Sequence, residues 1–162
     1  MKKIILLVAI VLGVSAQAQT FKVGAVVGLP AADASDLSSL VVGLDAYYYF
    51  TDVDDFLEIG ATAGFRNYFG DEVDILGTTV EFDDAQFLPI AAAGRIKVLD
   101  FLSAGADVGY ALGISDGLDG GLYLRPVAGI DIADTIEIVA SYETISDAAT
   151  WGNINVGLLF EF

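Results

Sequence analysis

The chain has 162 residues, of which 55% are hydrophobic, yet its formal net charge is -16. Only seven residues are Lys or Arg, which excludes nucleic acid as a partner, because binding a phosphate backbone depends on basic side chains that release counterions. The sequence has no cysteine and no histidine, which excludes disulfides, thiolate or imidazole metal sites and histidine-activated nucleophiles. We therefore expect no metal site of these types and no cofactor.

Residues 1–18 read MKKIILLVAIVLGVSAQA and have the three parts of an export signal. Two lysines precede an apolar run from Ile4 to Val14, and Ala16-Gln17-Ala18 has the small-x-small form of a cleavage site. The alternative is an N-terminal membrane helix, but the apolar run is shorter than the roughly 18 residues that a helical span needs. We expect a signal peptide over 1–18, removed after Ala18, and one domain over 19–162.

After this signal, apolar residues fall into short segments separated by turn residues, which is typical of strands. The sequence predicts strands at Thr20–Leu29, Leu40–Phe50, Phe56–Phe69, Ala85–Val98, Phe101–Gly113, Leu122–Ile132, Ile136–Ser146 and Asn153–Phe162. The connections alternate between long and short. This pattern predicts an all-β fold, an eight-stranded antiparallel up-and-down transmembrane β-barrel with both termini on the side of the short turns.

The fourth predicted strand is the least regular, because it contains Pro89. Proline has no N–H to give to a strand ladder, so we expect a bulge or a local distortion there.

Side chains alternate between two kinds along the strands, and successive strand residues point to opposite faces. In the last strand, one face carries Ile154 and Val156 and the other carries Asn153 and Asn155. Most strand glycines share the polar face, and the interior of an eight-stranded barrel is only just wide enough for side chains. The small and polar face is therefore predicted to line the lumen, with the aliphatic face outside.

The five bases of the mature chain all lie on this polar face, beside seven acids. An unpaired carboxylate is costly when buried, so this near balance predicts ion pairs inside the barrel, while the remaining acids lie in loops and turns. The alternative is a soluble sandwich with these charges scattered over its surface. The predicted lumen network comprises Lys22, Asp45, Glu58, Arg66, Arg95, Lys97, Asp107, Arg125, Asp131, Glu137, Glu143 and Glu161.

Aromatic residues gather toward both ends of the predicted strands, as they do at two membrane interfaces. For any single ring, ordinary packing at a strand end is the alternative. One expected belt comprises Phe21, Phe50, Phe101, Phe160 and Phe162, and the other comprises Phe65, Phe69, Phe87, Tyr110, Tyr142 and Trp151.

The export signal, the eight alternating strands, the long and short connections and the final segment GLLFEF at 157–162 resemble the small OmpA/OmpX-type outer-membrane β-barrel proteins of Gram-negative bacteria. The resemblance covers the whole mature chain and implies a monomer in the outer membrane, in contact with its lipid. It also implies that Phe160 and Phe162 are the aromatic residues recognised by the barrel-assembly machinery during insertion. A final strand that closes the barrel against the first would then account for a chain that ends without a polar tail.

The predicted function is a structural, adhesive or surface-interaction role, with a closed ion-paired lumen and acidic extracellular loops that meet a partner no motif identifies. The known outer-membrane barrel enzymes that act on lipid A, phospholipid or peptides rely on a histidine, so its absence here predicts a non-catalytic protein. Two alternatives are a soluble secreted or periplasmic β-barrel that binds a small apolar ligand, with its aliphatic face inward, and a narrow selective channel.

Two clusters of carboxylates carry further hypotheses. Glu137 with Glu143, or Asp107 with Asp131, would form an acid/base pair if they faced each other across the lumen, although ion pairing with the bases is the expected role. The segment from Asp71 to Asp84 has oxygen ligands for Ca²⁺ or Mg²⁺ but lacks the spacing of an EF-hand loop, so a solvated outer loop is expected.

Overall fold

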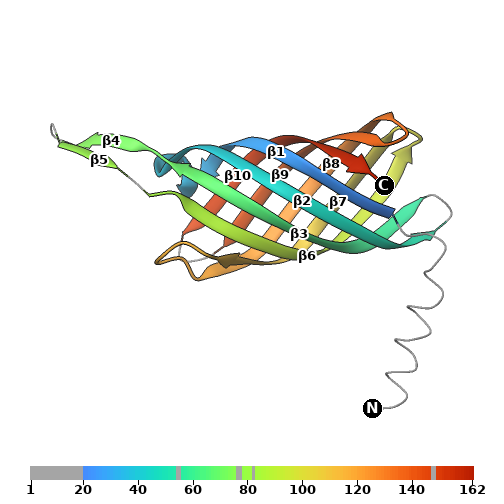
Figure 1. Cartoon of the computed structure of the whole chain (residues 1–162), viewed down its shortest axis with the longest axis horizontal. Helices are drawn as coiled ribbons and strands as arrows, with labels where there is room; N and C mark the ends of the chain where they lie inside the picture. Colours follow the sequence, from blue (N-terminus) through green and yellow to red (C-terminus); the bar gives the residue numbers. More distant parts are fainter. Residues whose placement is uncertain (1–19, 54–55, 76–77, 82, 147–148) are drawn as a thin grey trace, which may run out of the picture.

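The computed structural model describes residues 20–53, 56–75, 78–81, 83–146 and 149–162, so the signal peptide expected at 1–18 lies outside the described residues. Eight long strands form a closed antiparallel barrel (Figure 1), which confirms the predicted fold class. The barrel strands are β1 (Thr20–Ala32), β2 (Ser38–Val53), β3 (Leu57–Gly70), β6 (Ala85–Leu99), β7 (Leu102–Gly113), β8 (Gly120–Ala133), β9 (Ile136–Ser146) and β10 (Thr150–Glu161).

The barrel closes where the first strand meets the last. β1 pairs with β10 from Lys22 opposite Glu161 to Ala32 opposite Trp151, and each other barrel strand pairs with its sequence neighbours in the barrel. Because every strand has a partner on both sides, closure removes the exposed edges that an open sheet would present.

The two ends of the barrel have different connections. At the terminal end, where Thr20 and Phe162 lie, the connections are residues 54–56, 100–101 and 134–135. At the loop end, they are the 3₁₀ helix η2 (Asp33–Asp36), residues 71–84, residues 114–119 and residues 147–149. In the described part of the chain, no helix is long and apolar enough to cross a membrane. The predicted alternation of long and short connections is confirmed as far as β9, but the last connection, residues 147–149, is no longer than 54–56 because β10 begins earlier than predicted.

The longest connection contains a small hairpin that the sequence analysis did not expect. Strands β4 (Glu72–Ile75) and β5 (Thr78–Glu81) form a separate two-stranded sheet that extends beyond the loop end in Figure 1. Strands of four residues are too short for an alternating pattern to stand out among acidic residues, so this segment was interpreted as a loop.

The barrel strands also reach further toward the loop end than the sequence predicted. β1 continues to Ala32 where Leu29 was expected as its last residue, and β10 begins at Thr150 where Asn153 was expected. These additional residues pair with each other across the closing seam. A closed barrel offers every strand end a hydrogen-bonding neighbour, and this overrides the turn-like local composition.

The local distortion expected at Pro89 is confirmed, but it is not a bulge, since β3 and β6 keep one register on either side of it. Ala63 lies opposite Ile90 and Arg66 lies opposite Phe87, with the pairs between them missing. Proline removes one donor from the ladder, and here that loss interrupts the pairing without shifting it.

The aliphatic face of the strands lies outside and the small, polar face lies inside, as predicted. Ile154, Val156 and Leu158 are 60%, 54% and 43% exposed, whereas Asn153 and Asn155 on the same strand are almost completely buried. This orientation contradicts the alternative of a soluble barrel whose aliphatic face surrounds a ligand. Among the described residues of the barrel strands, the buried side chains therefore pack inside the lumen.

Two glycines on adjacent strands test this difference between the faces. A Cβ added to Gly105 would collide with the carbonyl oxygen of Gly94, whereas a Cβ added to Gly94 would meet nothing within 4 Å. We expect Gly105→Ala to lower the free energy of unfolding by about 2 kcal/mol through overpacking. The control Gly94→Ala should change it by less than about 0.5 kcal/mol. Urea titration of the protein refolded in detergent micelles measures both, and equal effects would contradict the assignment of the faces.

Candidate functional site

The candidate functional site is the set of charged side chains inside the barrel. Nine of the twelve residues predicted for the lumen network are buried. The other three, Lys97, Asp131 and Glu161, are partly exposed at the terminal end. The buried charges form two groups, a central cluster and a terminal cluster.

The central cluster is built around Arg66, which projects from β3 and is completely buried. Its Nη2 lies 2.8 Å from Asp45 Oδ1 and 2.9 Å from Glu143 Oε2, so it joins a carboxylate on β2 to one on β9. A planar guanidinium with five donors suits this bridging role better than a lysine ammonium would. Arg66 therefore ties together strands that are remote in the sequence.

Two further arginines extend the central cluster toward the terminal end. Arg125 Nη1 lies 2.8 Å from Asp45 Oδ2, and Arg95 Nη1 lies 2.8 Å from Asp107 Oδ1. The hydroxyl of Tyr47 connects these two pairs, because it accepts a hydrogen bond from Arg125 Nη1 at 2.9 Å and donates one to Asp107 Oδ2 at 2.8 Å.

The formal charges of the central cluster cancel, since three arginines (Arg66, Arg95 and Arg125) meet three carboxylates (Asp45, Asp107 and Glu143). Removing one partner from a buried group of this kind leaves an uncompensated charge, which is far more costly than the loss of an exposed pair. The arrangement holds six strands, β2, β3, β6, β7, β8 and β9, to one another through side chains as well as through the ladder.

The terminal cluster is built around Lys22 of β1. Its Nζ lies 3.1 Å from Glu137, 3.6 Å from Glu161 and 4.0 Å from Glu58. Ser103 also donates a hydrogen bond to Glu137, at 2.9 Å. One ammonium thus serves three carboxylates, and this end of the lumen is acidic.

Lys97 and Asp131 do not join an ion pair in the part of the chain that the structure describes. Both line a cavity of about 420 Å³ that opens at the terminal end, together with Lys22, Glu137 and Glu161. Contact with water there reduces the need for a direct partner.

The proposed acid/base pairs are not brought together. Glu143 belongs to the central cluster and accepts from Arg66, whereas Glu137 belongs to the terminal cluster and accepts from Lys22. Asp107 likewise lies in the central cluster, and Asp131 lies at the terminal cavity. In the structure, each buried carboxylate of these pairs is engaged by a base.

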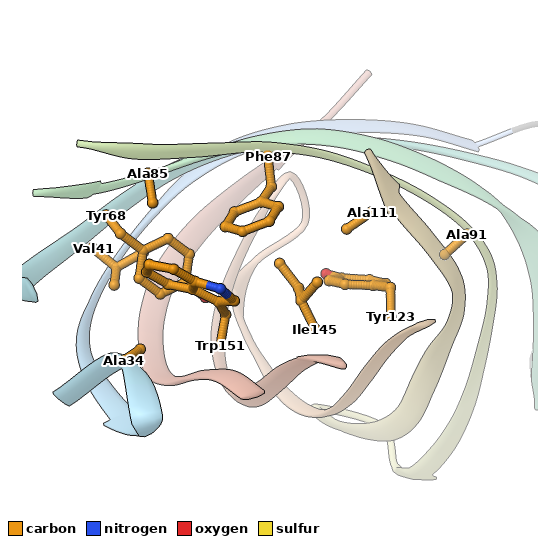
Figure 2. Close-up of a cluster of buried hydrophobic side chains, with 10 residues drawn as sticks. All are labelled: Ala34, Val41, Tyr68, Ala85, Phe87, Ala91, Ala111, Tyr123, Ile145 and Trp151. Atoms are coloured by element: carbon orange, nitrogen blue, oxygen red, sulfur yellow. The ribbon is translucent and has the colours of Figure 1, made fainter. Parts of the chain in front are cut away.

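The rings of Tyr68, Phe87 and Trp151 belong to one cluster of buried side chains inside the barrel, which Figure 2 shows. The rings of Tyr68 and Trp151 lie 5.2 Å apart, those of Phe87 and Trp151 lie 5.5 Å apart, and Tyr68 meets Phe87 edge-on at 5.8 Å. Ala34 of η2 is buried in the same cluster. We refer to Tyr68, Phe87 and Trp151 as the aromatic layer.

The aromatic layer corrects part of the predicted outer belt, because Phe87 and Trp151 were expected to face lipid and instead point inward. Each has the parity of the lumen face on its strand, where Trp151 aligns with Asn153 and Asn155. Other belt residues are exposed as expected, including Tyr110 at 47% and Phe101 at 53%. A position near a strand end suggests the outer belt for both rings, but their alternation along the strand indicates the lumen.

Uncharged polar side chains that the predicted network did not include complete it. Tyr123 donates to Glu143 at 2.9 Å, Asn153 donates to Tyr68 at 2.9 Å, and Ser141 accepts from Arg125 at 2.9 Å. All three occupy lumen-facing positions of their strands, so the same period-two pattern that selected the charges would have found them.

The residues predicted to act as the assembly signal, Phe160 and Phe162, lie on the outer surface at the terminal end, 44% and 80% exposed. The backbone N–H of Phe162 donates to the carbonyl of Phe21 at 2.9 Å, and the two rings lie 6.4 Å apart. The last residue is therefore held against the first strand of the barrel.

For the acidic segment 71–84, the structure describes only part of the side chains. Asp84 accepts hydrogen bonds from Asn67 Nδ2 at 3.0 Å and from the backbone N–H of Gly70 at 3.1 Å, and so fastens the base of the hairpin. Among the residues described, no group of three or more Asp or Glu is arranged to hold a metal ion. Cation binding by this segment remains a hypothesis.

No family model matches the chain, and no curated protein sequence matches it either. Solved structures with a similar fold exist. A de novo designed transmembrane β-barrel has a TM-score of 0.55 at 13% identity, covering 88% of this chain and 95% of the design.

The crystal structure of Ail, the attachment invasion locus protein of Yersinia pestis, has a TM-score of 0.55 at 16% identity, covering 89% of this chain and 97% of Ail. The structure of the outer-membrane protein Ail in a phospholipid nanodisc has a TM-score of 0.54, also at 16% identity, covering 87% and 99% of the two chains. The chain therefore has the fold of the small eight-stranded outer-membrane β-barrels, which confirms the fold that the resemblance predicted.

The central cluster gives a direct prediction for Arg66. Replacing it by methionine leaves Glu143 and Asp45 without their shared base, and we expect Arg66→Met to lower the free energy of unfolding by about 3 kcal/mol. Lys97→Met removes a base that has no ion pair among the described residues, so it should change stability by less than about 0.5 kcal/mol. Urea unfolding in detergent micelles measures both. A similar small effect for both variants would show that the central cluster does not stabilise the barrel.

Proposed function

We propose that this chain is a non-catalytic outer-membrane β-barrel with a structural, adhesive or surface-interaction role at the surface of a Gram-negative bacterium. The observation that carries the proposal is the outward aliphatic face around a charge-matched lumen. Hydrocarbon satisfies no backbone polar groups, so only helices and closed barrels span a bilayer, and a barrel must present apolar side chains to lipid. A monomer in contact with outer-membrane lipid meets these requirements.

The orientation of the barrel follows from its connections. Outer-membrane barrels have short periplasmic turns and longer extracellular loops. The loop end, with η2, the β4–β5 hairpin and residues 114–119 and 147–149, is accordingly extracellular. All charged residues in these connections are acidic, and the five bases after residue 18 lie within strands.

This distribution of charge limits the extracellular partner. A structure of Ail holds the heparin analogue sucrose octasulfate. A sulfated ligand needs Lys or Arg, and the extracellular connections of this chain have none. We propose that its surface partner is basic or neutral, so that binding does not bring like charges together.

A closed lumen supports the assignment as a structural or interaction protein over a channel or an enzyme. Arg66, Asp107 and Glu143 are completely buried in the centre of the barrel, and the aromatic layer fills its outer part. The buried lumen carboxylates are engaged by arginine or lysine, which opposes a free general acid or base at neutral pH.

Export and insertion complete the proposal. Residues 1–18 direct export and are cleaved after Ala18, and the barrel-assembly machinery recognises the outward rings of Phe160 and Phe162 at the terminal end.

A protease-site insertion tests location and orientation together. A site inserted between residues 76 and 77 should be cut in intact cells, because the β4–β5 hairpin is extracellular. The matched control, the same site inserted between residues 100 and 101, should be cut only after the outer membrane is broken. The detergent-solubilised protein should also migrate faster on gels before heating than after it. Recovery of the protein in the soluble periplasmic fraction would refute the proposal.

The assembly signal gives a second prediction. Phe160→Ala combined with Phe162→Ala should reduce the amount of barrel inserted in cells several-fold, while the purified variant refolds in detergent micelles like the unaltered protein. Phe101→Ala removes another exposed ring at the terminal end and serves as the control, with no loss of insertion expected. Equal losses for both variants would mean that these rings act as ordinary interface aromatics.

A further inference from the structure

A cavity of about 450 Å³ lies at the loop end, between the connection that precedes β6 and the connection that follows β7. We refer to it as the loop-end cavity. Three carboxylates and three larger apolar side chains line it, namely Asp83, Asp84 and Asp116, and Ile114, Leu118 and Trp151. No residue of the central cluster or of the terminal cluster contributes to this lining.

Hydrogen bonds join the two walls of the loop-end cavity. The hydroxyl of Ser115 accepts from the backbone N–H of Gln86 at 3.0 Å and donates to the carbonyl of Asp84 at 3.1 Å. The backbone N–H of Ile114 donates to the carbonyl of Gln86 at 2.9 Å. The carboxylate of Asp84 is itself held by the hydrogen bonds that fasten the base of the hairpin. The cavity is therefore formed before a ligand arrives, which lowers the entropic cost of binding.

The floor of the loop-end cavity is apolar and aromatic. Trp151 is only 8% exposed, and its ring packs against Tyr68 at 5.2 Å and Phe87 at 5.5 Å, as Figure 2 shows. Leu118 packs against the same buried cluster. An alkyl chain gains free energy by burial against such a surface, and the face of a tryptophan ring attracts cations. The floor therefore favours a ligand that joins an apolar stem to a positive charge.

The rim of the loop-end cavity carries only negative charge. Asp83, Asp84 and Asp116 are exposed there, and no Lys or Arg among the described residues lines the cavity. Within the described ranges, no group of three or more acids is arranged to hold a metal ion, so the rim suits a larger organic cation. A guanidinium is planar, binds carboxylates through two N–H donors and stacks on aromatic rings. An arginine side chain thus matches both the rim and the floor.

We propose that the loop-end cavity binds an arginine side chain presented by a protein outside the cell. The stem of that arginine packs on Trp151 and Leu118, and its guanidinium lies among Asp83, Asp84 and Asp116. The inference rests on the proposed function, which places the loop end outside. It deepens that function because it names the side chain that a basic partner must supply and the site that receives it.

Titration of the refolded protein with the blocked tripeptide acetyl-Gly-Arg-Gly-amide, in a non-ionic detergent, tests the ligand. Trp151 is the single tryptophan of the chain, so its fluorescence reports on this cavity. We expect a saturable change with this peptide and none with acetyl-Gly-citrulline-Gly-amide, in which a neutral urea group replaces the guanidinium. The amide resonances of Ser115 and Asp116 should shift in the same titration followed by NMR. No saturable change by either method, or an equal response to the citrulline peptide, would overturn the proposal.

Two double variants test the site. Asp83→Asn with Asp116→Asn removes two charges from the rim and should weaken binding of the arginine peptide on the order of tenfold. The control, Asp36→Asn with Asp119→Asn, removes two exposed charges at the same end that do not line the cavity. In about 0.15 M salt, screening should limit its effect to less than about twofold. Equal losses in the two double variants would assign the attraction to the general charge of the loop end and overturn the proposal.

Membrane orientation plays no part in the micelle measurement, so the cavity and the proposed function can fail separately. Loss of peptide binding, with the site between residues 76 and 77 still cut in intact cells, would refute the cavity and leave the proposed function. Peptide binding by a protein that is recovered in the soluble periplasmic fraction would refute the proposed function and, with it, the extracellular partner.

Discussion

The structure depends on one constraint, which is that every buried charge inside a narrow barrel must find a partner inside that barrel. With apolar side chains facing outward along all eight strands, a buried carboxylate or guanidinium on the inner face has no other way to be compensated. The central cluster meets this constraint with three arginines and three carboxylates, arranged so that Asp45 is shared by Arg66 and Arg125. The positions of the charges along the strands are thereby tied to the register of the whole barrel.

Register and ion pairing reinforce each other because the strand pattern has a period of two. A slip of one residue in β8 would move Arg125 to the outer face and leave Asp45 and Tyr47 without it. The same slip would place Val127 outside and Pro126 inside. Inward glycines serve this arrangement as well. A Cβ added to Gly43 or Gly64, for instance, would come within 3.4 Å of the Arg66 side chain, so glycine at these two positions leaves room for Arg66 in the central cluster.

The outer face and the loops divide the remaining tasks. Closure of the ladder satisfies the backbone polar groups that lipid cannot, and the aliphatic residues supply the surface that lipid favours. The acidic connections join the strands at the loop end, and connections of this kind tolerate change better than the strands that they join. A barrel of this kind can therefore present almost any surface chemistry at its loop end, which is why the fold alone does not specify the partner.

Much of this architecture could be predicted from the sequence, because a two-residue period is a strong local signal. It placed Arg66, Asp107 and Arg125 inside and Ile154 and Val156 outside. It did not predict which charges pair with each other. Arg66 pairs with Glu143, which lies 77 residues away in the sequence, and only the stagger of the strands in the closed barrel decides that contact. The extent of the strands was underestimated because pairing at the seam, and not composition, carries β1 through Pro30 to Ala32.

The orientation of the two faces is the central claim, and attachment of a nitroxide label to single cysteines tests it most directly. The chain has no native cysteine, so Val156→Cys and Asn155→Cys each give one defined site on adjacent residues of β10. In lipid vesicles, the label at 156 should collide readily with dissolved oxygen and rarely with a water-soluble nickel chelate, as a lipid-facing site does, whereas the label at 155 should be shielded from both. A label at 156 that is shielded from both reagents, with the label at 155 open to the nickel chelate, would contradict the account.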